Sequence, residues 1–399
     1  MLRSSSICLS FMYNYMTQNS DGDNFDKKSK NIKCLTKTLA KYGGVLTKVA
    51  QILSLENDDN NEVFSNCTPY LQKKTDEYIK ELYYNDDDNV LAEIDINLDE
   101  IYRSGSIGQV YKGVYNDDNI IVKVQYVGLR DQYNKDLNIL DKIVSYLYGK
   151  SKLETALEDV AEKLYEELNY NIEKENQKLM YHYFKDDEDI VIPKILDEFS
   201  SKNILVMEEM TDYISVYKFI ENSTQEQRNF IGELLVKFVF TSLYKHNILY
   251  SDCHYGNFLV KRDGTKLCVL DFGSIHYIDD DLLENLKSLH RIVKLDDKAG
   301  ILEHLMTMTI LDESVSEESR DYAYDFFTLQ YEPLVTNDEF EFYVEWLDLS
   351  STKNVDLMKE WYCPRHLIHF HKISYGLYHI LTKLDLCSNV CEIVDTILQ

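Results

Sequence analysis

Two short stretches decide the fold: Tyr250-Ser251-Asp252-Cys253-His254-Tyr255-Gly256-Asn257 and Leu270-Asp271-Phe272-Gly273. Between them, the apolar runs 258–261 and 267–270 flank the turn residues Arg262-Asp263-Gly264, which predicts a short β-hairpin. An aspartate, an asparagine five residues later and a second aspartate beyond a hairpin have the spacing that phosphoryl transfer needs. The two stretches therefore predict a site for that chemistry.

The roles follow from the residue types. Asp252 is the candidate catalytic residue, because a carboxylate near the γ-phosphate can orient an acceptor and take its proton. Asn257 and Asp271 are the candidate ligands of Mg²⁺, since hard cations prefer oxygen ligands. A D-x-x-x-x-N spacing alone recurs by chance in many proteins, so the prediction depends on its combination with Asp271-Phe272-Gly273.

A loop of small residues opens the preceding strand region. Small side chains let backbone amides approach phosphates, although glycine and serine also suit any tight turn. Upstream of the first hairpin, predicted at 109–115 and 119–125, the candidate nucleotide-binding residues are Ser104, Gly105, Ser106, Ile107, Gly108 and Val110.

A lysine within the second strand of that hairpin completes the phosphate site. Lys123 lies in the β-branched run Ile121-Val122-Lys123-Val124, where a lysine usually faces solvent. Its place after the small-residue loop matches the lysine that contacts the α- and β-phosphates. Such a lysine needs an acidic partner on a neighbouring helix, and Glu173 is the candidate among several nearby glutamates. Lys123 and Glu173 are therefore counted with the catalytic residues.

A hinge for adenine is expected after the strand at 203–206. Met207, Glu208 and Met210 occupy that segment, where backbone groups could contact the base. The prediction concerns the backbone, so the side chains here need not matter.

Composition limits the partners. The chain of 399 residues has 42 Lys and Arg against 69 Asp and Glu, a formal charge of −27. This charge argues against nonspecific binding to nucleic acid or to an anionic membrane face.

We expect no transmembrane segment, since no run of about 18 apolar residues occurs. The eight cysteines lack C-x-x-C spacing, which favours a soluble protein in a reducing, cytoplasm-like compartment.

The order of elements predicts an α+β, two-lobed fold, with strands in the first half and helices in the second. Helices are expected at 34–54, 69–84, 129–147 and 153–184. The expected divisions are a disordered tail at 1–30, a helical extension at 31–92, an N-lobe at 93–210 and a mostly helical C-lobe at 211–399.

With these residues placed, the chain resembles the UbiB-like (ADCK) atypical kinases over about residues 35–290. Lys48-Val49-Ala50-Gln51 looks like the K-x-G-Q signature of that family, with Ala50 at the glycine. The other stretches that look like family motifs are Ser106 to Val110, Val122 to Tyr126, Glu167 to Tyr170 with Glu173 and Asn176, and the Asp252 and Asp271 stretches. Gly105 departs from the alanine-rich loop, and Asn169 replaces an aspartate.

The resemblance implies a protein-kinase-like fold that uses ATP and Mg²⁺. It implies that Lys48 and Gln51 line the active site, that Lys123 pairs with Glu173, and that the extension covers the peptide-binding region of ordinary kinases. Family members are linked to quinone and lipid metabolism, often through ATPase activity, so a lipid or isoprenoid substrate or partner is expected.

Two alternatives remain open. One is a pseudokinase scaffold that holds nucleotide without turnover, although every residue needed for chemistry is present. The other is a small-molecule kinase of the aminoglycoside or choline type, which shares the D-x-x-x-x-N loop but does not account for Phe272-Gly273 after Asp271.

Overall fold

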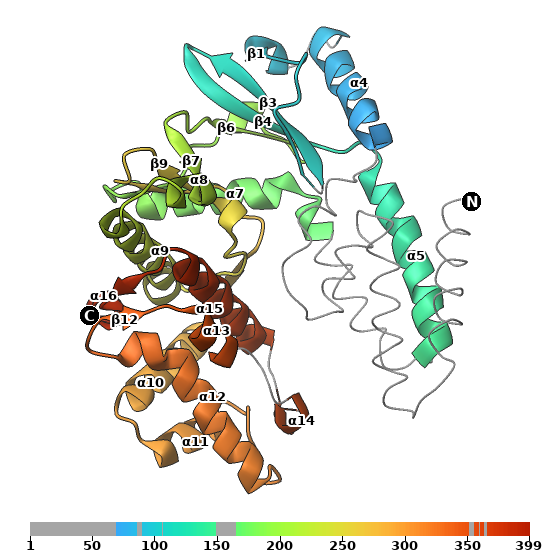
Figure 1. The fold of residues 1–399 in the computed structure, drawn as a ribbon. Helices are drawn as coiled ribbons and strands as arrows, with labels where there is room; N and C mark the ends of the chain where they lie inside the picture. Colours follow the sequence, from blue (N-terminus) through green and yellow to red (C-terminus); the bar gives the residue numbers. More distant parts are fainter. Residues whose placement is uncertain are drawn as a thin grey trace. The chain divides into compact units, whose positions relative to one another are not determined.

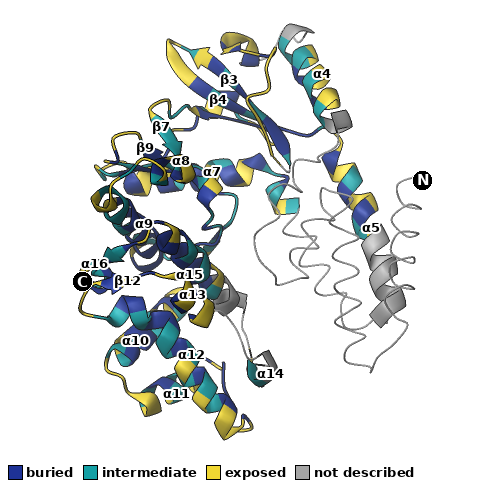
Figure 2. Ribbon diagram, in the orientation of Figure 1, coloured by how far each residue is buried: buried dark blue, intermediate teal, exposed yellow. Residues whose placement is uncertain are grey.

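The structure is a computed structural model that describes residues 69–85, 90–105, 107–148, 165–350, 355–358, 360–362 and 365–399. These residues form two compact units, whose elements and burial are shown in Figures 1 and 2. Unit 1 comprises the described residues up to Glu175 together with Lys194–Glu209, and unit 2 comprises Asn176–Pro193 together with Met210–Gln399. The parts of the sequence prediction outside the described residues are the tail at 1–30, the helix at 34–54, Lys48, Gln51 and Ser106.

Unit 1 is built on a five-stranded antiparallel sheet with the order β1-β3-β4-β6 and with β2 paired to β3. The strands are β1 (Asp95–Ile96), β2 (Arg103–Ser104), β3 (Gly108–Tyr115), β4 (Asp118–Gln125) and β6 (Ile204–Glu208). Asn116 and Asp117 lie between β3 and β4 with φ angles of 50° and 68°, the left-handed conformation that tight hairpin turns require. The first predicted hairpin is confirmed.

Two helices of unit 1 match the sequence periodicity, α4 (Pro69–Asn85) and α5 (Leu129–Tyr148). In α4, Ile79 is fully buried in a core that includes residues of β3 and β4. A hydrogen bond also joins this helix to β3, since Asp76 Oδ1 accepts from the Tyr111 hydroxyl at 3.2 Å. The helix predicted at 69–84 is thus confirmed, and it packs on the sheet.

The single helix predicted over 153–184 is wrong, because the chain leaves the helical conformation at Asn169 and α7 (Tyr170–Phe184) begins there. Asn169 Oδ1 accepts a hydrogen bond from Asn171 N at 3.3 Å. A short polar side chain that bonds the backbone in this way competes with a continuing helix. The interruption places Glu173 in the first turn of α7.

The core of unit 2 surrounds α9 (Gln225–His246), which is buried along much of its length (Figure 2). Thr224 and Gln227 form a capping box at its start, and Asn247 ends it in the left-handed conformation with φ 57°. A helix with apolar residues on most of its circumference is expected to be covered on several sides. Accordingly, α9 packs against α15 (Arg365–Lys383) and α16 (Val390–Leu398).

The other elements of unit 2 are mostly helical. Its further helices are α8 (Val216–Ile220), α10 (Asp280–Lys294), α11 (Lys298–Thr307), α12 (Glu317–Val335), α13 (Val344–Ser350) and α14 (Val355–Met358). Its strands are β5 (Ile190–Val191), β7 (Tyr213–Ser215), β8 (Ile248–Tyr250), β9 (Phe258–Lys261), β10 (Leu267–Val269), β11 (Ile275–Tyr277), β12 (Phe340–Glu341) and β13 (Cys387–Ser388). They pair as a four-stranded sheet β5-β10-β9-β7 and as the pairs β8–β11 and β12–β13.

The predicted α+β, two-lobed fold is confirmed by a sheet-based unit 1 and a mostly helical unit 2. The second predicted hairpin is confirmed as β9 and β10. The short strands β7, β8, β11, β12 and β13 were not predicted. In the part of the chain that the structure describes, no helix has the length and apolar character needed to cross a membrane.

Candidate functional site

The segments that carry Asp252 and Asp271 are held together by a two-stranded sheet in unit 2. Strands β8 and β11 pair antiparallel with Tyr250 opposite Ile275. Immediately beyond this pair, Ser251 donates two hydrogen bonds to the Ser274 carbonyl oxygen, from its backbone N at 3.0 Å and from Oγ at 2.8 Å. The segment 251–257 and the Asp271-Phe272-Gly273 segment therefore share one anchor.

Asn257 is oriented by Asp252. Its Nδ2 donates to the Asp252 carbonyl oxygen at 2.9 Å and to Asp252 Oδ2 at 2.7 Å. Leu270 N donates to the Asn257 carbonyl oxygen at 2.9 Å, which brings the residue before Asp271 beside Asn257. The structure thus gathers the three predicted polar residues of this half of the site.

The oxygen atoms left over fit a hard cation. Because Asn257 uses its Nδ2 for Asp252, its Oδ1 accepts no hydrogen bond from the described residues. Asp271 Oδ1 accepts from Gly273 N at 2.9 Å, while Oδ2 accepts none from the same set. A carboxylate and an amide oxygen are suitable ligands for Mg²⁺, which usually keeps several waters. Asn257 and Asp271 therefore fit the predicted metal.

Asn176 fixes the Phe272 backbone, a role that the sequence did not assign to it. This buried side chain in α7 donates from Nδ2 to the Phe272 carbonyl oxygen at 2.9 Å and accepts at Oδ1 from the Tyr277 hydroxyl at 3.3 Å. Phe272 itself is fully buried. The signal was the position of Asn176 three residues after Glu173, one turn along the same helix.

In unit 1, Lys123 and Glu173 form an ion pair. Val122 and Val124 are fully buried in the sheet core, so Lys123 projects from the opposite face of β4. There its Nζ lies 2.8 Å from Glu173 Oε1, and the two side chains are 21% and 9% exposed. The structure brings these two predicted residues together across 50 positions of sequence.

The small-residue loop is a tight turn closed by its own backbone. Gly105 N donates to the Gly108 carbonyl oxygen at 2.8 Å, and the Tyr126 hydroxyl donates to the Gly105 carbonyl oxygen at 3.2 Å. Gly108 is required by packing, since a Cβ there would lie 2.4 Å from the Val124 carbonyl oxygen. Gly105 has no such restriction, with the nearest atom at 3.6 Å.

The remaining predicted loop residues lie around this turn. Ser104 is exposed at the end of β2, and Ile107 is half-buried. Val110 pairs directly with Lys123 in the sheet register. The loop and the lysine are therefore adjacent parts of unit 1.

The predicted hinge residues differ in their surroundings. Met207 is buried against Leu205 and Tyr170, whereas the Glu208 side chain is exposed. Glu208 N donates to the Lys194 carbonyl oxygen at 3.0 Å, so this N–H is already engaged. Met210 is half-buried and begins the second segment of unit 2. Contact of this segment with a base stays a prediction.

Tyr250, two residues before Asp252, has a buried ring and a buried hydroxyl. Its ring contacts Phe272 edge-to-face at 5.9 Å between centroids, and its Oη is buried with no hydrogen-bond partner among the described residues. Burial raises the pKa of Tyr250 well above its ordinary value, and the charges of Asp271 and Asp252 raise it further. The hydroxyl therefore stays protonated. Within the described part of the chain, no hydrogen bond offsets the free-energy cost of removing it from water.

We expect Tyr250→Phe to leave the free energy of unfolding unchanged or to raise it, because an unpartnered buried hydroxyl costs about 1–3 kcal/mol. Urea unfolding followed by circular dichroism measures the change. The matched control is Tyr255→Phe, which removes a hydrogen bond from the Tyr255 hydroxyl to the His379 carbonyl oxygen at 3.1 Å and should lose about 1 kcal/mol. Equal losses in the two variants would contradict the assignment.

Comparison with known proteins decides the family. The model of the ABC1 atypical kinase-like domain matches residues 62–305, more than half of the chain. The chain belongs to the ABC1 atypical kinase-like family. The predicted resemblance to UbiB-like atypical kinases is thereby confirmed, since relatives named COQ8 atypical kinases also match.

Curated relatives of this ABC1 chain come from several eukaryotes. The probable serine/threonine-protein kinase abkA of Dictyostelium discoideum is 25% identical over 73% of this chain and 55% of its own length. Atypical kinase COQ8, mitochondrial, of Saccharomyces cerevisiae is 24% identical over 89% of this chain and 73% of its own length. The chloroplastic protein ACTIVITY OF BC1 COMPLEX KINASE 8 of Arabidopsis thaliana is 25% identical over 71% of this chain and 38% of its own length. The chain thus spans about half the length of several relatives that it matches.

A solved structure supports the fold alone. The complex of Rv3197 with erythromycin from Mycobacterium tuberculosis matches with a TM-score of 0.68 at 20% identity, over 94% of this chain and 97% of that chain.

Proposed function

We propose that the chain binds Mg²⁺ and ATP and catalyses phosphoryl transfer or ATP hydrolysis. The observation that carries the proposal is the ion pair of Lys123 and Glu173, 2.8 Å apart and largely buried. Holding two long charged side chains together away from water is costly unless the geometry is good. A strand lysine of no functional importance would reach solvent instead. A phosphate-binding role explains why this one is held by a helix 50 residues away.

The proposed residues of each unit have a separate task. Lys123, directed by Glu173, contacts the α- and β-phosphates, and the backbone of the loop around Gly105 covers them. Asp252 orients the attacking hydroxyl or water and accepts its proton. Asn257 and Asp271 hold Mg²⁺, which supplies charge neutralisation on the phosphates when bound. Retention of all these residues favours catalysis over a pseudokinase scaffold.

The family resemblance adds less direct proposals. Lys48 and Gln51 would line the active site from the extension at 31–92, and a quinone- or lipid-linked molecule would be the physiological substrate or partner. Both rest on the motif match of the sequence.

The nucleotide site is tested by binding to variants of two strand lysines. Lys123→Met should abolish the rise in melting temperature that Mg·ATP produces, because the phosphate contact is lost. Lys112→Met is the matched control, since Lys112 lies in the neighbouring strand β3 and also pairs with a glutamate, Glu209. For a nucleotide 100-fold above its Kd, the stabilisation lost corresponds to about 2.7 kcal/mol. An unchanged response in Lys123→Met would exclude the proposed role.

A further inference from the structure

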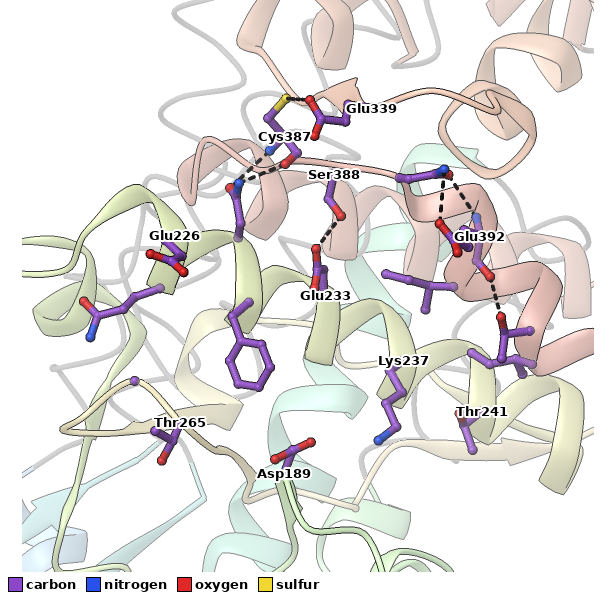
Figure 3. A pocket seen from close by; sticks show the side chains of 18 of the residues that line it. Asp189, Glu226, Glu233, Lys237, Thr241, Thr265, Glu339, Cys387, Ser388 and Glu392 are labelled. Carbon is purple, nitrogen blue, oxygen red and sulfur yellow. Dashed lines mark hydrogen bonds between the residues drawn. The ribbon is translucent and has the colours of Figure 1, made fainter.

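A large groove runs along α9 in unit 2 and shares no residue with the proposed phosphoryl-transfer site. Its floor is the face of α9 from Glu226 to Thr241, and its volume is about 1340 Å³. One wall is the β9–β10 turn at Asp263 to Thr265, and the other is β13 with α16 (Figure 3). We call this feature the α9 groove.

The walls of the α9 groove are fixed to its floor by side chains of α9. Gln227 Nε2 donates to the Asp263 carbonyl oxygen at 3.1 Å, which holds the turn. Asn229 bonds the backbone of Cys387 in both directions, with Nδ2 donating at 2.9 Å and Oδ1 accepting at 3.3 Å. Ser388 donates to Glu233 across the same wall, as Figure 3 shows. The groove is therefore preformed, which reduces the ordering cost of binding.

Negative charge dominates the lining. Its carboxylates are Asp189, Glu226, Glu233, Asp263, Glu339 and Glu392. Among the described residues, Lys237 is the one basic side chain of the lining, and its Nζ is already paired with Asp187 at 2.7 Å. Hydrogen bonding from Thr265, followed by contact with Lys261, lowers the pKa of Asp263 to about 2. The groove thus stays anionic at neutral pH and repels phosphates, nucleic acid and anionic lipid.

Apolar side chains lie among these charges. Phe230 is 36% exposed although it occupies the second turn of α9, and Ile393 and Ile397 of α16 also line the groove. A small polyamine would satisfy the carboxylates but would leave the aromatic ring uncovered. An occupant with both basic and apolar side chains is complementary to both features.

We propose that the α9 groove docks a basic, amphipathic peptide segment of a partner protein. The acidic lining favours a basic occupant over a second copy of this acidic chain, and the exposed Phe230 favours a peptide with apolar side chains over a small cation.

The test uses a fluorescein-labelled 15-residue peptide with lysines on one helical face and leucines on the other, and fluorescence anisotropy as the readout. The parent should bind it, while the same peptide with glutamates in place of lysines should not bind. The double variant Glu226→Lys/Glu339→Lys should weaken binding about tenfold or more. Phe230→Ser should weaken it as well, since apolar contact is lost.

A control variant with two charge reversals outside the groove tests whether the peptide binds in the groove or is attracted to the acidic protein in general. Glu303→Lys/Asp325→Lys changes the net charge by the same amount on exposed helical positions outside the groove lining, and should change the Kd less than about twofold. Should the first pair fail to fold, Glu226→Gln/Glu339→Gln replaces it.

Four outcomes would overturn the proposal. The first is no binding by the folded parent at low ionic strength. The second is equal weakening of binding by the two charge-reversal pairs. The third is full displacement of the peptide by spermine together with no effect of Phe230→Ser, which would assign the groove to a polyamine. The fourth is a parent dimer that the groove variant dissociates, measured by sedimentation, which would assign the groove to a second copy of the chain.

Discussion

Replacing Asp271 with asparagine is expected to lower Mg²⁺-dependent ADP release at least about a hundredfold. The substitution keeps the size of the side chain and an Oδ1 that can still accept from Gly273 N, now 2.9 Å away. Only the negative charge and one oxygen ligand are lost, so the fold should survive. Coupled-enzyme measurement of ADP at saturating Mg·ATP gives the rate. If this variant releases ADP at the rate of the parent, the assignment of Asp271 as a Mg²⁺ ligand is wrong.

Asp312→Asn is the control for this substitution. Asp312 Oδ1 also accepts from a backbone N two residues later, Ser314 N at 2.7 Å, so the local geometry changes in the same way. Asp312 lies outside the candidate site, and the turnover of this variant should equal that of the parent. Loss of activity in both variants would indicate damage to the fold rather than to the chemistry.

Gly376→Ala is expected to lower turnover, because it would displace the segment that carries Asp252, the candidate catalytic residue. Gly376 lies in α15, and a Cβ there would be 2.5 Å from the Cys253 carbonyl oxygen, next to Asp252. Ordinary van der Waals contact begins near 3.4 Å, so helix or loop must move by about 0.9 Å. A displacement of about 1 Å near reacting groups can lower turnover about a hundredfold.

The stability change should be smaller than the change in rate. Overpacking costs about 1–3 kcal/mol, while replacing a helical glycine by alanine returns about 1 kcal/mol. Gly232→Ala is the control, because its Cβ would meet only the flexible end of the Leu386 side chain, at 2.9 Å. That variant should keep its turnover. If Gly376→Ala retains the parental kcat, close packing of α15 is not what positions the loop.

The sequence predicted the longer elements correctly where local signals agree. Strands β3 and β4 combine β-branched residues with an Asn-Asp turn, and α4 has clear helical periodicity. Strands β8 and β11 were missed because three residues are too few to establish an alternating pattern, and their pairing joins Tyr250 to a residue 25 positions later. The break before α7 was missed because it depends on one side chain, Asn169.

In the candidate site, the ion pair was predictable from the sequence, whereas long-range contacts of other side chains were not. The pairing of Lys123 with Glu173 was expected from motif order, and the structure places the two side chains together. The contact of Asn176 with the Phe272 carbonyl oxygen joins positions 96 residues apart, so the spacing of Asn176 from Glu173 indicates a shared helical face but not this partner. The α9 groove was also not predictable, since Asn229 and Cys387 are 158 positions apart. The chemical roles of all these site residues stay predictions.

The most direct test of the central proposal is ADP release by the purified parent chain from ATP, with Mg²⁺ present and with Mg²⁺ removed by excess EDTA. We expect release that continues over many turnovers with Mg²⁺ and stops with EDTA. Anionic liposomes added to the same assay should increase the rate if a lipid-linked partner is involved. Binding of Mg·ATP without any ADP release would contradict catalysis and would instead support a nucleotide-holding scaffold.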